Sequence, residues 1–226
     1  MHIPSSSTSV LDIASFSQAL GLSDKTRLSD YDHSKWLYVP NVYSEYRYIL
    51  GTRGKNPLIC VGINPSTAEP DNLDNTLKSV ERIAHANGYD SFIMFNVYAQ
   101  RATNPDDMDL VLNERLHREN MAAFRYVLGL YGEGNRPAVW AAWGAIIEKR
   151  DYLPSLIGDF YEISKKYGAC WFSCGAISKN HTAVLADADY AAIGALADAL
   201  VRSIPPGPVY LTMEQDAAKA LGQALA

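Results

Sequence analysis

Positive charge and cysteine are both scarce in this chain of 226 residues, which has a formal net charge of −5 and three cysteines. The acidic balance excludes the broad basic surface with which non-specific duplex-DNA binders displace counterions from phosphates. Any contact with nucleic acid is therefore expected to be local. Two of the cysteines, Cys60 and Cys170, lie inside apolar runs where cysteine behaves as a small buried hydrophobe, so a reducing compartment is expected.

Several motifs that mark common classes of enzyme are also missing. The sequence has no Gly-rich phosphate-binding loop, no Gly-x-Ser-x-Gly nucleophile elbow and no dinucleotide-binding fingerprint. Cys170 and Cys174 are separated by three residues and no His pair complements them, so we expect no metal and no other cofactor. NTPase, serine-hydrolase and dinucleotide-dependent activities therefore lose support.

Long apolar segments are absent as well. The longest apolar run, 138–147, is about half the length of a helix that crosses a bilayer. Residues 1–9 have neither the basic nor the apolar stretch of a secretory signal, and we expect them to form a frayed tail. These observations predict a cytoplasmic protein that does not bind a membrane.

The remaining composition is that of an ordinary globular protein, with 48% hydrophobic and 20% charged residues, so the chain can bury a core without disulfides. Four short apolar runs, at 57–63, 91–97, 137–143 and 169–174, alternate with longer segments of helical periodicity. Such alternation is typical of an α/β fold with a parallel sheet. We therefore predict a three-layer sandwich in which helices flank a central, mainly parallel, four-stranded sheet.

The N-terminal part is expected to elaborate this fold. Residues 1–33 are predicted to form an N-terminal extension with a short amphipathic helix over 9–22, and residues 34–226 a single α/β domain. The runs 35–39 and 45–50 predict two short strands or an edge hairpin. Further helices are expected over residues 72–87, 106–131, 145–167 (interrupted near Pro154), 187–201 and 212–225.

The best candidate for a functional residue is Asn64, which follows the first apolar run. In an open parallel sheet, ligands bind beyond the carboxyl ends of the strands. The Asn64 amide could hold a water or a ligand amide, and Pro65 stiffens the turn. An Asn that merely caps the next turn is the alternative, although Ser66 and Thr67 could already do so. We predict Asn64 as catalytic and Pro65, Ser66 and Thr67 as substrate-binding residues.

The ends of the second and third runs offer further candidates. Asn96 could read a planar ring that carries an amide, such as a nucleobase, by paired hydrogen bonds. Arg101 could bind a phosphate or carboxylate, while a surface salt bridge is equally open. Trp143 could form a stacking plate for a ligand or pack in the core. All three are predicted substrate-binding residues.

The loop after the fourth run contributes a cation and an imidazole, Lys179 and His181. Lys179 could bind the substrate and stabilise a developing anion, and His181 could transfer a proton as a catalytic residue. A lone loop histidine without a function is the alternative. Asp74 could bind Mg²⁺, act as a base or begin a helix, and these possibilities stay open.

Two segments resemble a known protein family. Residues 62–68 read Gly-Ile-Asn-Pro-Ser-Thr-Ala, and residues 95–103 read Phe-Asn-Val-Tyr-Ala-Gln-Arg-Ala-Thr. With residues 74–76 and 87–89, they resemble the bacterial and phage family catalogued as domain of unknown function 1643, over about residues 44–181. More distantly, the same landmarks and Trp143-Gly144 resemble the uracil-DNA glycosylase superfamily, especially its mismatch-specific uracil/thymine branch.

The distant resemblance implies a uracil-DNA-glycosylase-like fold and an N-glycosidase that acts on a nucleobase, in a nucleotide or in single-stranded or flipped-out nucleic acid. It implies that Asn64 positions the attacking water, that Asn96 lies near the base-reading pocket and that Ser66 lines it. The superfamily's last motif is a His-Pro or Asn-Pro wedge loop, and the comparable residues here, 178–185, contain no proline. Two alternatives therefore stay open: a non-catalytic module that binds a nucleotide or modified base, and a partner-binding protein that uses the Tyr-rich residues 36–48.

Overall fold

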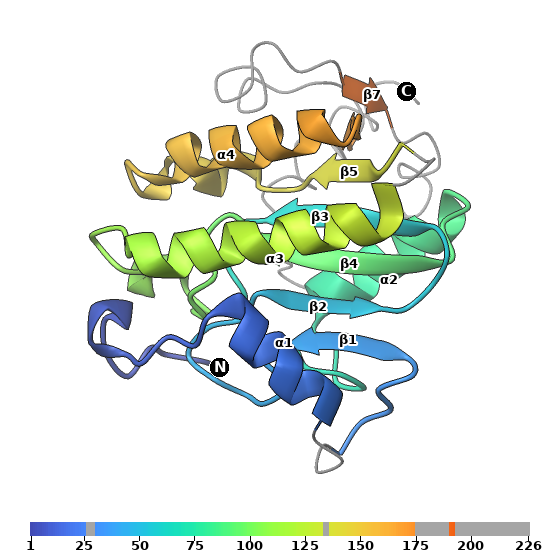
Figure 1. Cartoon of the computed structure of the whole chain (residues 1–226). Coiled ribbons are helices and arrows are strands. Elements are labelled where there is room, and N and C mark those ends of the chain that lie inside the picture. Colours follow the sequence, from blue (N-terminus) through green and yellow to red (C-terminus); the bar gives the residue numbers. More distant parts are fainter. Residues whose placement is uncertain (26–29, 133–135, 175–189, 193–226) are drawn as a thin grey trace, which may run out of the picture.

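The computed structural model describes residues 1–25, 30–132, 136–174 and 190–192, and a single sheet runs through them (Figure 1). Its strand order is β1-β2-β4-β3-β5-β6-β7. The strands are β1 (Trp36–Val39), β2 (Ile49–Thr52), β3 (Pro57–Gly62), β4 (Ser91–Asn96), β5 (Ala138–Ala141), β6 (Cys170–Ser173) and β7 (Tyr190–Ala192). Strands β4, β3, β5, β6 and β7 run parallel to one another, whereas β2 pairs antiparallel with both β1 and β4. The predicted α/β class and the four parallel strands from the apolar runs are confirmed.

The predicted count of four strands is wrong, because the described residues form a seven-stranded sheet. The expected hairpin is part of this sheet, since β2 pairs with β4 through Leu50↔Met94 and Gly51↔Ile93. Gly51 allows this close approach: a Cβ there would lie 2.8 Å from the Ile93 Cα and even nearer the carbonyl oxygen of Phe92. The pairing of two distant strands depends on such contacts, which a local pattern does not reveal.

The last strand, β7, also corrects the expected helix over 187–201. Residues Tyr190–Ala192 are extended and pair with β6, so a helix does not cover these three residues. The rest of that predicted helix lies outside the described residues. The predicted helix over 212–225 also lies outside them.

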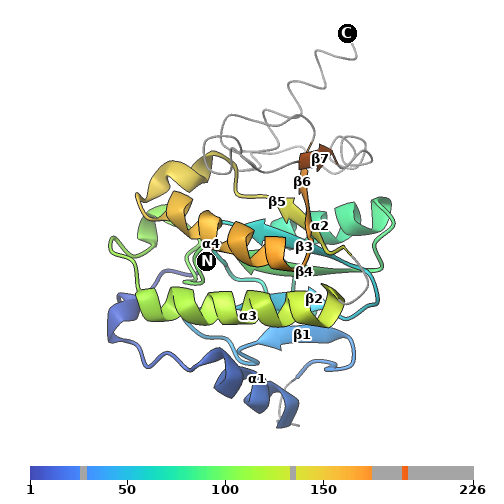
Figure 2. The same cartoon turned by 45° about the horizontal axis from the view of Figure 1, so that its top comes forward.

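Helices cover both faces of the sheet and produce three layers (Figures 1 and 2). One face packs against α1 (Phe16–Lys25), α3 (Glu114–Gly132) and α4 (Leu153–Lys166), and its core contains Val61, Phe95 and Phe160. The opposite face packs against α2 (Asn75–Ala86), with Cys60 and Leu77 in its core. Every residue of β3 and β4 is buried, as expected for strands between two helical layers.

The helix ends follow from local capping. Asp74 caps α2, because its Oδ1 accepts a hydrogen bond from the Leu77 amide at 2.9 Å. The predicted helix over 145–167 is broken as expected: a 3-10 helix, Gly144–Lys149, precedes α4, and Pro154 lies in the first turn of α4, where its missing N–H costs no hydrogen bond. At the start of the chain, α1 begins at Phe16, later than expected, and a short 3-10 helix, Thr8–Val10, precedes it.

The first residues of the chain are anchored, which corrects the expected frayed tail. His2 is 9% exposed and Thr8 is 1% exposed. The Thr8 amide donates to Asp109 Oδ1 at 3.1 Å, and the Thr8 hydroxyl bonds to the same carboxylate. Because a buried carboxylate holds Thr8, residues 2–8 follow a fixed path across the domain.

Among the residues that the structure describes, no helix combines the length and the apolar character that crossing a membrane requires.

Candidate functional site

The candidate site lies at the carboxyl ends of β3 and β4. From the central strand β3 the chain passes first to β4 on one side and later to β5 on the other. Such a reversal of direction opens a crevice at the carboxyl ends of parallel strands, where ligands of doubly wound folds bind. The loop 63–69 leaves β3 at this edge, and the segment 97–103 leaves β4 beside it.

Hydrogen bonds join these two segments. Asn64 Nδ2 donates to the carbonyl oxygens of Ala102 at 2.7 Å and Pro65 at 3.2 Å. The Ala102 amide donates to the Pro65 oxygen at 2.9 Å, and the hydroxyls of Ser66 and Thr103 lie 3.1 Å apart. The structure therefore brings Asn64, Pro65 and Ser66 together with the Arg-Ala-Thr sequence. Thr67 is half-buried in the same loop.

The orientation of the Asn64 amide follows from these contacts. Only its nitrogen can donate to the two carbonyl oxygens, so Oδ1 must face the other way. Oδ1 accepts no hydrogen bond from any described residue, and Asn64 is half-buried. The loop thus presents a fixed acceptor that could hold a water molecule.

Asn96 ends β4, and its side-chain amide has no hydrogen-bond partner among the described residues. Its side chain is 1% exposed, and neither Oδ1 nor Nδ2 is hydrogen-bonded within the described part of the chain. Leaving a buried polar group unpaired costs about 1–3 kcal/mol, so such groups are rare in folded proteins. Oδ1 lies 3.4 Å from the position of a Cβ on Gly62, on the face of the sheet that α2 covers. The fold alone gives this amide no role.

Two buried arginines lie next to the loop 63–69. Arg101 is fully buried and Arg47 is 2% exposed. Arg101 Nη1 donates to the carbonyl oxygens of Ser66 and Ala68, and its Nη2 donates to the Tyr38 hydroxyl at 2.9 Å. Arg47 Nη1 donates to the same Ala68 oxygen at 3.1 Å. The two guanidinium groups are therefore neighbours, and Arg101 does not form the surface salt bridge that was its alternative role.

The positive charges of Arg47 and Arg101 have little compensation from negative charges of the described residues. Neither arginine forms an ion pair with a carboxylate in the described residues. The pKa of Arg47 is lowered from 12.5 to about 9, first by burial and second by the positive charge of Arg101, while Asp74 acts in the opposite direction. The Tyr43 ring lies under Arg101, with Cζ 4.3 Å from the ring centroid, and supplies a cation–π contact.

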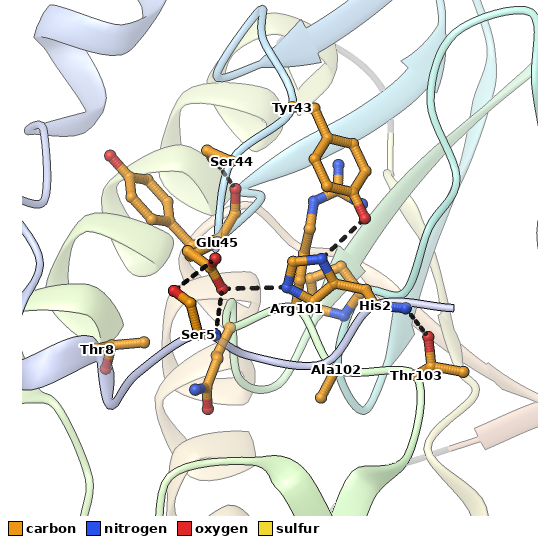
Figure 3. A network of polar contacts seen from close by, with 12 residues as sticks. His2, Ser5, Thr8, Tyr43, Ser44, Glu45, Arg101, Ala102 and Thr103 are labelled. Atoms are coloured by element: carbon orange, nitrogen blue, oxygen red, sulfur yellow. Dashed lines mark hydrogen bonds and ion pairs between the residues drawn. The ribbon is translucent and has the colours of Figure 1, made fainter.

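The N-terminal segment closes this side of the site (Figure 3). The His2 amide donates to Thr103 Oγ1 at 2.6 Å, and the Thr103 amide donates to the His2 oxygen at 2.9 Å. The two ring nitrogens of His2 lie 2.9 Å from the Tyr43 hydroxyl and 3.1 Å from Glu45 Oε2. His2 thus connects the segment after β4 to the tyrosine that covers Arg101.

A family model, described as a protein of unknown function (DUF1643), matches residues 47–183, which is more than half of the chain. The chain belongs to this family. The matched residues include Arg47, Asn64, Asn96 and Arg101, whereas His2, Tyr38 and Tyr43 precede the matched segment. No curated protein and no solved structure matches the chain with significant similarity.

Trp143, another predicted site residue, lies elsewhere. Trp143 is 1% exposed and packs edge to face on Trp171, with ring centroids 5.8 Å apart, in the core on the α3 and α4 side. This is the core-packing alternative, on the face of the sheet opposite to Asn96. Lys179 and His181 lie outside the described residues. Of the roles considered for Asp74, the structure shows the one at the start of a helix, because Asp74 caps α2.

Sequence reasoning missed Arg47, Tyr43 and His2. One local signal pointed to Arg47: it lies between Tyr46 and Tyr48, and a charged residue in an aromatic strand-like run needs a partner when it is buried. Nothing local marked His2 or Tyr43, because their roles arise from contacts with residues far along the chain.

Proposed function

We propose that this chain binds a nucleobase at the carboxyl ends of β3 and β4 and hydrolyses the bond between that base and its sugar. The unpaired, buried amide of Asn96 is the observation that carries the proposal. A carboxamide offers one donor and one acceptor side by side, which match the amide edge of a base with two hydrogen bonds. Gly62 lies beside Oδ1, and the space that its missing side chain leaves is taken by the methyl group of Met94, 2.5 Å from the position of a Cβ, so a base would have to displace this flexible side chain.

The arrangement of Asn64 supports the hydrolytic step. Its half-buried Oδ1 would accept a hydrogen bond from a water, and the two bonds from Nδ2 hold the amide in place. The oxygen of that water would bond to the anomeric carbon as the bond from this carbon to the base nitrogen breaks. The electron pair leaves with the base, and the proton of the water passes to solvent. The unpaired Nδ2 of Asn96 would donate a hydrogen bond to the departing base and stabilise its negative charge.

The order of motifs along the chain supports the same proposal, because it resembles that of the uracil-DNA glycosylase superfamily. On this proposal the three layers correspond to the uracil-DNA-glycosylase-like fold. The substrate would be a free nucleotide or a base in single-stranded or flipped-out nucleic acid, since the net charge of −5 disfavours a broad contact with duplex DNA.

A second candidate function is nucleotide binding without catalysis. It is favoured by one observation: the partners of Asn64 among the described residues are main-chain oxygens, so no carboxylate or imidazole is placed beside this amide to take the proton of the water. The partner-binding alternative finds less support, because four of the aromatic residues in 36–48 are buried and only Tyr43, 43% exposed, is available on the surface of that segment: the buried ones are Trp36, Tyr38, Tyr46 and Tyr48.

Base release and ligand-dependent thermal stability together test the proposal. The protein is incubated with nucleosides, nucleotides and single-stranded or mismatched DNA containing uracil or hypoxanthine, and free base is measured by chromatography. We expect release by the wild type, no release by Asn64→Ala, and loss of both release and thermal stabilisation in Asn96→Ala. Asn56→Ala is the control, because Asn56 also carries an amide but precedes β3, at the opposite end of the sheet from Asn96.

The outcomes separate the two functions. Stabilisation by a nucleobase compound without release of base would refute hydrolysis and establish the binding module. Neither release nor stabilisation, from a folded protein, would refute both.

A further inference from the structure

Several hydrogen-bond donors of Arg47 and Arg101 have no acceptor within the part of the chain that the structure describes. Arg47 makes its only hydrogen bond with a described residue through Nη1, although the side chain is 2% exposed. The Nε atoms of Arg47 and Arg101 are both buried, and neither has a partner in the described part of the chain. A guanidinium that served only to hold the loop 63–69 would not need these donors.

The hydrogen bonds that hold the loop 63–69 explain why Arg101 is buried, but they explain the burial of Arg47 less well. Arg101 holds the oxygens of Ser66 and Ala68 and bonds to the Tyr38 hydroxyl. Arg47 adds one further bond to an oxygen that already has a donor. Asp74 is the acidic residue with the largest electrostatic effect on Arg47, but its Oδ1 is committed to capping α2. Arg47 therefore brings a second buried charge to the loop without a structural need for it.

Two adjacent guanidinium groups with free donors form a site for an oxyanion. Each group is a planar fork that can donate two parallel hydrogen bonds to a phosphate or carboxylate, and a bound anion would offset the repulsion between the two charges. Arg47, Arg101 and Asn96 all lie at the same end of the sheet. Asn96 is the last residue of β4, Arg101 lies in the segment that follows β4, and Arg47 lies just before β2, the strand next to β4.

We propose that Arg47 and Arg101 bind the phosphate group of a nucleotide whose base pairs with Asn96. The identity of the base site rests on the proposed function, whereas the oxyanion site rests on the two arginines alone. The ligand would be a nucleotide or a nucleic-acid strand rather than a free base or nucleoside. Access to the pair lies on the Tyr43 side: Tyr43 is 43% exposed, and its hydroxyl is held there by the ring of His2.

Binding measurements with matched ligands test this inference. Affinities of the full chain for nucleosides, the corresponding nucleoside monophosphates and inorganic phosphate are measured by calorimetry at constant ionic strength. We expect a monophosphate to bind at least about tenfold more tightly than its nucleoside, as one or two charge-assisted hydrogen bonds would produce. In Arg47→Met this ratio should fall to about twofold or less. Arg118→Met is the control, because Arg118 carries the same charge on α3 with its side chain 67% exposed, and there the ratio should stay unchanged.

The possible results distinguish this inference from the proposed function. Equal affinity for nucleoside and monophosphate would overturn the inference and leave the base site intact. Binding of inorganic phosphate that Arg47→Met abolishes, without binding of any nucleoside, would support the oxyanion site and overturn the proposed function. Absence of all binding would overturn both. If Arg47→Met does not fold, Arg47→Lys keeps the charge without the fork, and a monophosphate preference equal to that of the wild type in this variant would overturn the inference.

Discussion

Replacing Asn96 and Asn120 by alanine, one at a time, tests whether the Asn96 amide is reserved for a ligand. Both side chains are buried amides at the same point of the fold, on opposite faces of the end of β4. Asn120 Nδ2 donates to the main-chain oxygen of Asn96 at 2.8 Å, whereas the Asn96 amide has no partner in the described residues. The two substitutions remove the same atoms, so the cost of the cavity is similar and the difference reports the hydrogen bonding.

The expected difference follows from these contacts. Asn120→Ala loses the hydrogen bond to the buried Asn96 oxygen, which costs about 1–3 kcal/mol, and also removes an Oδ1 that has no partner among the described residues, which offsets part of this cost. Asn96→Ala removes two atoms that are both unpaired among the described residues and gains free energy on this account. Because alanine has a higher helix propensity than asparagine, the substitution in α3 also stabilises Asn120→Ala by about 0.5 kcal/mol. Asn120→Ala should therefore be the less stable variant by about 1–2 kcal/mol.

Urea denaturation of both variants without ligand measures this difference, and thermal unfolding should show a gap of about 2–8 °C. Equal stabilities, or a lower stability of Asn96→Ala, would refute the reasoning. Either result would mean that the Asn96 amide stabilises the fold.

Three further predictions concern the rest of the structure. Gly51→Ala should lower the free energy of unfolding by about 1–3 kcal/mol in a denaturant titration, because the added Cβ would overlap main-chain atoms of β4 at Phe92; unchanged stability would contradict the close approach of β2. Asp109→Asn should lower the free energy of unfolding by about 2–3 kcal/mol, since the Asp109 carboxylate accepts hydrogen bonds from Thr8 and Tyr98. Residues 1–8 should then become sensitive to limited proteolysis, and resistance equal to that of the wild type would argue against their anchoring by Asp109. Burial raises the pKa of Tyr98, so the Tyr98 hydroxyl stays protonated in the folded state at a pH near 10, where the same hydroxyl ionises in the unfolded chain. The contribution of Tyr98 to the free energy of unfolding should therefore decline as the pH rises above about 10. The stability advantage of the wild type over Tyr98→Phe should then shrink above that pH, and a constant advantage would show that Tyr98 does not titrate in this way.

Local patterns predicted the strands that form the centre of the sheet. The apolar runs became β3, β4, β5 and β6 because hydrophobic periodicity is a property of neighbouring residues and does not depend on distant contacts. The strand-end rule then located Asn64 and Asn96, since the carboxyl ends of parallel strands share one edge. The same rule does not predict on which face of the sheet a side chain lies. Trp143 packs in the core on the face opposite to Asn96.

By itself, the sequence determined the α/β class, the family and the position of the candidate site after β3 and β4. Only the tertiary structure decided that β2 joins β4, that Arg47 shares the Ala68 oxygen with Arg101, and that His2 bonds to a threonine 101 residues later. These contacts join residues that are far apart along the chain, and any of several partners would satisfy the same local pattern. The physical reason is that hydrogen bonding and charge depend on which groups meet once the core has packed, whereas periodicity depends on the chain alone.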